Sequence, residues 1–491
     1  MTTHFMEHLF PLHKTNRRIF IKGVGFVSAS LLLGTLGGCE DLEESIRNRP
    51  MRRRLRTGSA AVDADIATYR EAVRLMKERS AQNSADKRGW TFQAAIHGTA
   101  GVGFNHCEHG TNHFFSWHRA YLFAFEKICQ KLTGNNKFGL PYWNWNQNKV
   151  VHPDYLVTSS PLFSPRTRTD VSGEEAISTA LLDPIFADNN FFTFSSSIEG
   201  TPHNNIHTYV GNIFGGFGSA RDPLFWNHHC MVDYCWDKWN VEMGNDNTSD
   251  ATWIGTSWDH FIDADGDPQT ITAGVTTLMT LLSYQYESSA IGSHPAKIII
   301  KTNADFKKVE TRLRKGADYK FDIRERISIV DTARISIARP FSKQLEAAPS
   351  TFQRIIESDS AHERIFAHIQ YASLPPTSDF FVRVFINLPE ANASTPITDP
   401  HFAGTFAFFG TDTGDQQRGD GHRHQPRFLV NVTNALQKLR SAQLLKNDEA
   451  ISVQLVAVPF GQQFEKADTF VQLNKIELIV TPVIVRAQQP Q

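Results

Sequence analysis

The sequence predicts a mainly α domain, a four-helix bundle with long loops, followed by a β-rich C-terminal domain. Two patterns support this order. Apolar residues recur at helical spacing in the first part of the chain, between loops marked by Pro and Gly. After about residue 295, short runs rich in Val, Ile and Phe alternate with turn residues, which is typical of an antiparallel β domain. With 491 residues, the chain is also too long for a single compact core.

The helices are expected in the first domain. From about Val62, the residues Ile66, Tyr69, Val73 and Met76 share one face of an amphipathic helix. Further helices are expected over 114–132, 204–210 and 225–242. The strands of the second domain are expected at 297–301, 327–338, 380–388, 402–409, 451–458 and 475–482. We therefore predict a helical domain at 61–295, a linker at 296–326 and a β-sandwich-like domain at 327–491.

Residues 1–39 are predicted to be an export signal. The paired Arg17 and Arg18 precede a short apolar run that ends in Leu36, two glycines and Cys39. The paired arginines resemble a twin-arginine (Tat) signal, and the end of the run resembles a bacterial lipobox. A plain N-terminal anchor is the alternative. The resemblance implies a protein of the periplasm or cell envelope, with a possible membrane tether through a lipidated Cys39.

Residues 40–60 are interpreted as a solvated linker, because six arginines between Arg47 and Arg56 make the stretch strongly polar. The chain as a whole has a net charge of only −1, which argues against nucleic acid or a charged membrane surface as its main partner. Five Cys are few for a disulfide scaffold, and the odd number leaves at least one of them unpaired.

Nine histidines gather in two short windows. The first window, 94–126, holds five of them, and the second, 199–239, holds four. Hydrogen-bonded structural roles are the usual explanation for a single buried His, but they do not account for so dense a set. The clustering therefore predicts a metal centre formed from His97, His106, His109, His113, His118, His203, His207, His228 and His229.

The ligand type narrows the choice of metal. Imidazole suits copper, zinc, iron and nickel. His203 and His207 have the i, i+4 spacing that places both rings on one helix face, but the Glu of a zinc protease motif is absent between them. Neutral imidazoles without an obvious carboxylate ligand favour a soft, redox-active pair of ions. Copper fits best.

The motifs around these histidines resemble the type 3 copper proteins, which are the tyrosinases, catechol oxidases and molluscan haemocyanins. Residues 114–122 match the pattern Phe-x-x-Trp-His-Arg-x-Tyr-Leu, and 222–239 match the second signature. Further matching segments are 69–76, 90–97, 140–145 and 202–211. The resemblance implies two copper ions, with copper A bound by His97, His109 and His118, and copper B bound by His203, His207 and His229.

Two ligand positions have competing neighbours. His228 is the alternative to His229, which is favoured because Asp233 follows it by one helical turn. In the family this Asp does not bind the metal itself. It orients the imidazole of a histidine that does. His106 is the weaker alternative to His97.

The neighbours of His109 are interpreted separately. Cys107 lies two residues before it, which resembles the thioether bridge of fungal tyrosinases and molluscan haemocyanins, in which the sulfur bonds to the ligand ring. A small buried thiol is the alternative. His113 lies on the predicted helix away from the His118 face and is expected to be structural. Cys129, Cys230 and Cys235 are interpreted as buried or unassigned.

The resemblance implies an oxidoreductase that uses molecular oxygen on phenolic and catecholic small molecules. Oxidation of an o-diphenol gives an o-quinone, and a monooxygenase activity would first hydroxylate a monophenol. Glu199 precedes His203 by four residues, where several relatives hold a water near the coppers, and Asn204 matches an Asn associated with hydroxylation. We predict that Glu199 and Asn204 are catalytic and polarise that water into a base. The alternative for Asn204 is a helix-start residue that caps backbone N–H groups.

Access to the metals is predicted from two regions. In the loop 213–221, Phe217 or Gly216 is expected to lie nearest copper A. Residues 380–390, 401–406 and 451–459 resemble, more weakly, the C-terminal domain of plant polyphenol oxidases, which covers the copper site and keeps the enzyme latent. Latency with activation by trimming is therefore expected here. His422 and His424 are interpreted as a solvated loop, with transient contact to copper during loading as the alternative.

Three rival functions stay open at this point. The closest is a strict catechol or o-aminophenol oxidase without monophenolase activity. A haemocyanin-like oxygen-binding protein is less favoured, because haemocyanins are large assemblies and this chain has one copper domain. A non-catalytic copper-binding lipoprotein would not need six histidines in this arrangement. Turnover separates these functions, whereas the fold alone does not.

Overall fold

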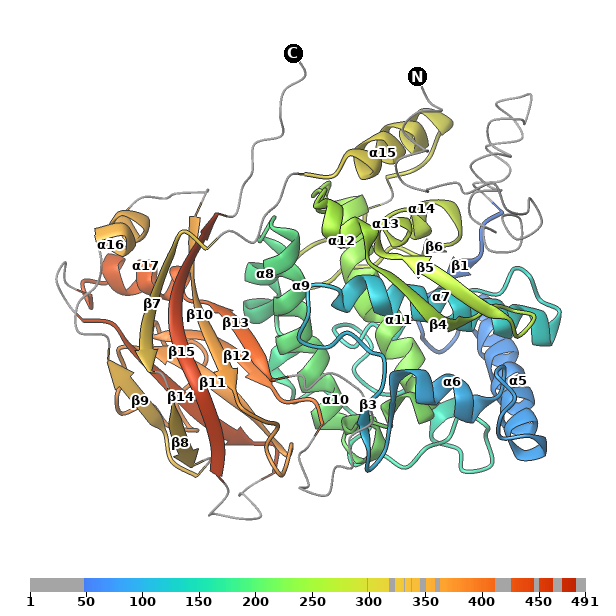
Figure 1. Ribbon diagram of the computed structural model, residues 1–491, viewed down its shortest axis with the longest axis horizontal. Coiled ribbons are helices and arrows are strands. Elements are labelled where there is room, and N and C mark those ends of the chain that lie inside the picture. Colours follow the sequence, from blue (N-terminus) through green and yellow to red (C-terminus); the bar gives the residue numbers. More distant parts are fainter. Residues whose placement is uncertain are drawn as a thin grey trace.

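The computed structural model consists of a helical part and a β-rich part packed side by side (Figure 1). It describes residues 48–482 apart from 298, 318–322, 331, 337, 345–349, 358–362, 411–424, 446–449 and 462–469. The predicted signal with Cys39 and the histidines at 422 and 424 lie outside the described residues. Within the described residues, no helix has the length and apolar character needed to cross a membrane.

The four predicted helices are present in the helical part. They are α5 (Ala60–Gln82), α7 (Phe114–Thr133), α10 (Asn204–Val210) and α11 (Pro223–Asp237). The sequence did not predict the short helices α6 (Trp90–His97), α8 (Thr179–Phe186), α9 (Phe191–Ile198), α12 (Ala251–Gly255), α13 (Ala273–Thr276) and α14 (Met279–Leu282). Small strands connect the loops: β1 (Met51–Arg52) with β6 (Gln285–Tyr286), β2 (Gly98–Thr99) with β3 (Gly103–Phe104), and β4 (Ser257–Ile262) with β5 (Pro268–Thr272).

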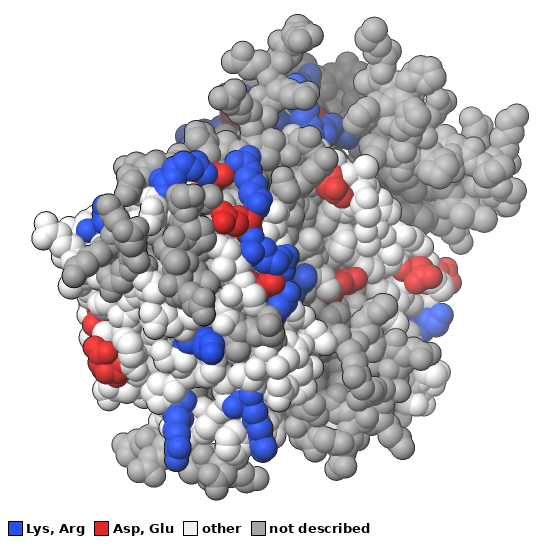
Figure 2. All heavy atoms as spheres, turned by 60° about the vertical axis from the view of Figure 1, so that its left-hand side comes forward, with Lys and Arg blue, Asp and Glu red and all other residues white. Residues whose placement is uncertain are grey.

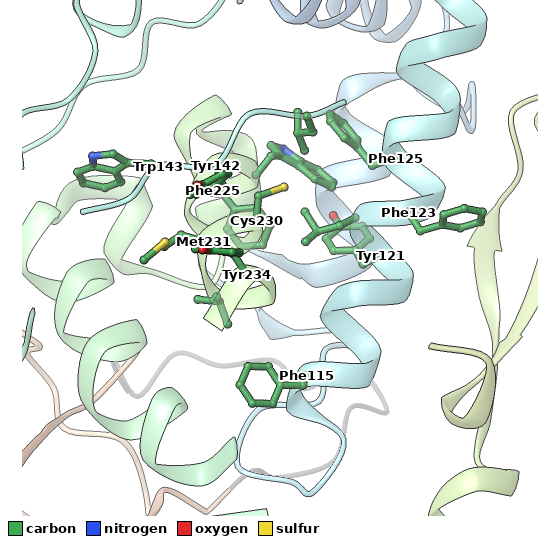
Figure 3. Close-up of a cluster of buried hydrophobic side chains, with 14 of the residues drawn as sticks. Phe115, Tyr121, Phe123, Phe125, Tyr142, Trp143, Phe225, Cys230, Met231 and Tyr234 are labelled. Atoms are coloured by element: carbon green, nitrogen blue, oxygen red, sulfur yellow. The ribbon is translucent and has the colours of Figure 1, made fainter. Parts of the chain in front are cut away.

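Helices α7 and α11 form the centre of the helical part and are buried on nearly all sides. Figure 3 shows aromatic side chains of α7, among them Tyr121 and Phe125, directed toward α11. The Phe125 and Trp226 rings stack with their centroids 3.5 Å apart. Helix α5 joins them through the Tyr69 hydroxyl, which donates to the carbonyl of Pro223 at 2.7 Å. This rigid aromatic core fixes the two helices that carry histidines from both windows.

One helix changes its winding at the site. Helix α9 continues into α10 through a π-helical turn, Glu199–His203, that contains Pro202. Proline has no N–H to donate, so a wider turn at this point costs the helix little. π-Turns inside helices are frequent at functional sites. This one begins at Glu199 and ends at His203, two residues that the sequence assigned to the site.

The arginine-rich segment is built into the core, so its interpretation as a solvated linker is wrong. Arg52 is fully buried, and its guanidinium donates to Glu126 Oε2 at 2.8 Å and to Asp233 Oδ2 at 3.1 Å. Arg49 donates to the carbonyls of Thr280 and Leu281 at 2.9 and 2.5 Å. Each charge that leaves water has an oxygen partner, which is the condition under which buried arginine is tolerated.

The β-rich part contains two antiparallel sheets that enclose one apolar cluster. One sheet has the order β13-β10-β15-β7, with β8 also paired to β15, and the other has the order β12-β11-β14-β9. Figure 2 shows this part from outside, with basic side chains spread over it and acidic ones beside some of them. The strands are β7 (Glu325–Val330), β8 (Ala333–Ser336), β9 (Phe341–Gln344), β10 (Glu363–Tyr371), β11 (Phe380–Ile386), β12 (Phe402–Ala407), β13 (Arg427–Asn431), β14 (Ser452–Pro459) and β15 (Phe470–Pro482), with helices α16 (Ser350–Glu357) and α17 (Thr433–Ser441).

Two expectations near the domain boundary are wrong. No strand forms at 299–301, because Ile299 and Ile300 instead pack against a small cluster that includes Leu281. The predicted linker also contains a helix, α15 (Asn303–Lys315). It begins with a capping box in which Thr302 and Asp305 satisfy each other's backbone N–H groups, a start signal that the sequence reading missed.

The two parts meet along β12 and the α9–α10 helix. The Thr201 hydroxyl donates to the carbonyl of Thr405 at 2.8 Å. Arg383 of β11 forms an ion pair with Glu175 at 2.6 Å, and both side chains are only 14% exposed. The end of β12 therefore lies against the turn that carries Glu199 and His203.

Candidate metal centre

Three segments of the first window supply the first group of histidines. His97 ends α6, His109 lies in the following loop, and His118 lies one turn into α7. All three are buried. His97 Nε2 lies 3.1 Å from His109 Nε2, and the His109 and His118 ring centroids are 4.9 Å apart.

The second window supplies a matching group. His203 ends the π-turn, His207 follows on α10, and His229 lies on α11. His207 Nε2 lies 3.2 Å from His229 Nε2, and the His203 and His207 rings are 4.7 Å apart. The His118 and His229 rings stack at 4.4 Å, so the two groups are adjacent.

Hydrogen bonds fix the orientation of five of the six rings. Each of these rings directs Nδ1 toward an acceptor, which leaves Nε2 facing the other histidines. The pairs are His97 with the Phe217 carbonyl at 3.4 Å, His109 with Glu199 at 3.3 Å, His118 with the Phe114 carbonyl at 2.8 Å, His203 with Asn204 at 2.9 Å, and His207 with the Phe214 carbonyl at 2.7 Å. Nδ1 of His229 has no partner among the described residues.

Burial keeps these imidazoles neutral, which is the form that binds metal. It lowers the pKa of His97 and of His203 to about 3, and it lowers the pKa of the other four well below the usual value.

The ring nitrogens of the cluster are arranged to bind metal ions rather than to hydrogen-bond with one another. Nε2 of His118 and of His203 are buried without a partner, which costs free energy unless something binds them. Two Nε2 atoms 3.1–3.2 Å apart, as in each group, have the separation of neighbouring ligands at bonds of about 2.0 Å to one ion. Such all-imidazole sites suit copper.

Proximity alone does not separate His228 from His229. His228 is also buried, and its ring lies 4.5 Å from that of His207. His229 also stacks on His118, which His228 does not, so His229 contacts both groups and stays the predicted ligand.

The predicted role of Asp233 is wrong, although its position one turn after His229 is correct. Its carboxylate accepts from Arg119, Arg52, Tyr284 and Tyr286 at 2.5 to 3.1 Å, and not from a ligand imidazole. These four donors satisfy the carboxylate. Asp233 therefore holds α7, α11 and the N-terminal segment together beneath the site.

The remaining residues of the first window lie as follows. His113 stacks on Trp253 at 5.5 Å, away from the cluster, as expected for a structural residue. His106 is exposed and stacks on His260 at 4.3 Å. Cys107 is buried, with its sulfur within 4.8 Å of ring nitrogens of His97 and His109. The other described cysteines are also buried and free.

Glu199 and Asn204 both line the site, but they contact different histidines. Glu199 Oε1 accepts from the Gly110 N–H at 2.6 Å and faces His109 Nδ1. Burial raises the pKa of Glu199 to about 8, although the Gly110 N–H opposes the shift. Asn204 accepts from His203 and donates to the carbonyl of Ala407 at 2.8 Å. It caps no backbone N–H group, so the helix-start alternative for Asn204 is wrong.

Sequence reasoning missed one residue of the site, Phe409, which follows β12. Its ring is 5% exposed and lies 4.1 Å from the His207 ring, 5.1 Å from His109 and 5.6 Å from His203. The expected gate residue Phe217 packs beside it, against Phe104 at 4.8 Å. Phe409 belongs to a predicted strand, but nothing in the sequence indicates that this strand end reaches the histidines.

Comparisons with known proteins agree with this geometry. The family model described as the common central domain of tyrosinase matches residues 87–180 and 159–242. Tyrosinase HcTyr1 of Hahella sp. is 24% identical over 480 residues, covering 85% of this chain and 97% of that protein. Residues 87–242 therefore resemble the central domain of the tyrosinases, and the chain is similar to type 3 copper proteins of the tyrosinase and polyphenol oxidase family. Tyrosinase-family proteins hold two copper ions, and the two histidine groups are suited to them. The protein is a copper oxidoreductase.

Plant relatives extend the likeness. Polyphenol oxidase II of Ipomoea batatas is 30% identical over 283 residues, but this covers 45% of this chain and 47% of the plant protein. The chain thus matches about half the length of such plant relatives. A solved structure of latent aurone synthase, a polyphenol oxidase, superposes with a TM-score of 0.62 at 18% identity, covering 89% of this chain and 90% of that one. This likeness confirms the fold, including the β-rich C-terminal part.

Proposed function

We propose that this type 3 copper oxidase is a tyrosinase, which hydroxylates monophenols and oxidises o-diphenols to o-quinones with molecular oxygen. In this proposal His97, His109 and His118 hold copper A, and His203, His207 and His229 hold copper B. The two coppers supply the redox chemistry with oxygen. The observation that carries the proposal is the pair of polar side chains, Glu199 and Asn204, each directed at the ring of a different ligand.

Glu199 supplies a base of suitable strength. A phenol titrates near pH 10, so an ordinary carboxylate is a poor acceptor for its proton. Burial raises the pKa of Glu199 to about 8, closer to that of the substrate, so the ionised form that accepts a proton becomes the major one only above about that pH. The carboxylate is buried beside His109, where an incoming phenol can reach it directly or through one water. Transfer of the phenol proton to Glu199 prepares the phenolate that hydroxylation needs.

Asn204 acts on His203. Its carboxamide oxygen accepts a hydrogen bond from the Nδ1–H of His203. This bond fixes the tautomer and makes Nε2 the ligating atom. The hydrogen bond also raises the basicity of that imidazole. Glu199 and Asn204 contact different ligand rings, and the water that they would polarise stays a prediction.

The test compares Asn204→Gly and Glu199→Gln with the unaltered chain, all copper-loaded and trimmed by limited protease. Oxygen uptake and quinone absorbance are measured with a monophenol and with the matching catechol. We expect both variants to lose monophenol turnover by at least about tenfold more than catechol turnover, which is the effect of one general base. An unchanged ratio in both variants would refute the proposed roles. Catechol turnover alone in the unaltered chain would make the protein a catechol oxidase.

We also propose that the β-rich part keeps the enzyme latent through Phe409. The ring occupies a space between the two histidine groups, of the size that a monocyclic phenol needs. Contacts at Thr201 and Asn204 hold the end of β12 in place, and the ion pair of Glu175 with Arg383 holds the neighbouring strand β11. A substrate can enter only after this ring withdraws.

A further inference from the structure

Helix α15 has one apolar face and one basic face. Phe306, Val309 and Leu313 are buried in a cluster with Val241 and Leu281. At 100° per residue, the opposite side carries Lys307, Lys308, Thr311, Arg314 and Lys315, all exposed. The two acidic residues of the helix, Asp305 and Glu310, lie outside this side. Exposed Lys297 and Lys301 precede the helix.

The charge on this face is not neutralised locally. Only Arg314 is paired, with Glu310 at 2.8 Å. In the described part of the chain, no ion pair joins Lys307, Lys308 or Lys315 to a carboxylate. In the β-rich part, by contrast, Arg324 and Arg354 pair with Glu363, and Arg326 pairs with Glu477. Helix α15 therefore concentrates positive charge on its outer face, although the net charge of the chain is only −1.

The chain enters the fold beside this helix. Arg49 donates to the carbonyls of Thr280 and Leu281 in α14, and Leu281 belongs to the cluster that buries the apolar face of α15. Figure 1 shows α15 at the edge of the helical part, close to α12 and α13. Cys39 precedes Asn48 by nine residues, which span at most about 30 Å when fully extended. A lipid on Cys39 would keep this side of the protein near the bilayer.

We propose that the outer face of α15 is a docking surface for anionic lipid headgroups. It presses the helical part against the membrane to which Cys39 is tethered. The apolar face of the helix is occupied by the protein, so the attraction is electrostatic and the helix does not insert. One acyl chain holds a protein only marginally, and a basic patch is a common second signal. The exposed side has no aromatic residue on which a nucleic-acid base could stack, which disfavours a single-stranded nucleic acid as the partner.

The test uses the full chain with Cys39→Ser, which removes the lipid site, and measures sedimentation with vesicles. The vesicles are phosphatidylcholine alone or phosphatidylcholine mixed with phosphatidylglycerol. The variant is Lys307→Gln/Lys308→Gln/Lys315→Gln. The matched control is Lys87→Gln/Lys137→Gln/Lys343→Gln, which removes three exposed lysines of other elements.

Each basic residue near an anionic surface contributes roughly fivefold to binding, so the α15 variant should bind the mixed vesicles roughly 100-fold more weakly. The control should change by less than about twofold per charge, and added salt should weaken binding of the unaltered chain. Equal binding to both vesicle types, or an equal loss in the control, would overturn the proposal. So would absent vesicle binding, with RNA binding that depends on the same lysines.

Discussion

Replacing Phe409 by Ala should activate the untrimmed enzyme. The ring is 5% exposed and contacts rings of both histidine groups. Burying a Phe side chain stabilises by about 1.5–3 kcal/mol, and most of that holds the end of β12 over the site. Losing about 2 kcal/mol raises the open population by about 30-fold. We therefore expect catechol turnover of untrimmed Phe409→Ala to rise by at least about tenfold.

The assay is oxygen uptake with a catechol, on untrimmed and trimmed protein. The control is Phe408→Ala, which removes the neighbouring ring from the core of the β-rich part, where it packs on Tyr371 at 4.8 Å. This control loosens the β-rich part but leaves Phe409 in place. The reasoning fails if trimming activates the unaltered chain while Phe409→Ala does not, or if Phe408→Ala activates equally.

Three further outcomes are expected. Arg52→Ala should lower the free energy of unfolding in urea by about 3–5 kcal/mol, since it leaves the buried Glu126 carboxylate without its charged partner and removes one donor to Asp233, whereas Arg54→Ala should change it by less than about 0.5 kcal/mol. Burial raises the pKa of Glu174 from 4.5 to about 8, so its proton is bound more tightly in the folded state, and stability should fall as pH rises through this window. Glu174→Gln should lack that fall, and parallel pH profiles would contradict it. If Cys107 forms a thioether with His109, the intact mass of copper-loaded protein should lie two hydrogen atoms below that of the sequence, and Cys107→Ala should show no such deficit.

The gathering of the histidines could be predicted in part from local rules, whereas the assignment of six of them to two coppers rests on the family resemblance. The i, i+4 spacing of His203 and His207 places two rings on one helix face, and the pattern around His118 is specific. The position of a residue on its helix did not predict its hydrogen-bond partners, however. Asp233 lies one turn after His229, as expected, but Arg119 and Arg52 reach it from other segments. Which donors approach a carboxylate depends on the packing of α7, α11 and β1, which helical spacing does not encode.

Contacts over long sequence separations were beyond sequence reasoning. Phe409 reaches histidines about 200 to 310 positions earlier, through the docking of one folded part on another. Arg52 has the same local pattern as a solvated arginine, and only its buried partners distinguish it. The segment of helix α15 was predicted to be a linker, because most of its residues are charged and its apolar face consists of only three side chains.

The most direct test of the account is the copper content of single histidine variants after loading and dialysis. Each of the two groups is expected to hold one ion, so the unaltered chain should retain two coppers and His229→Asn only one. His228→Asn, the neighbouring control, should retain two. Loss of copper in His228→Asn with full retention in His229→Asn would contradict the assignment, and a single copper in the unaltered chain would contradict the dinuclear centre.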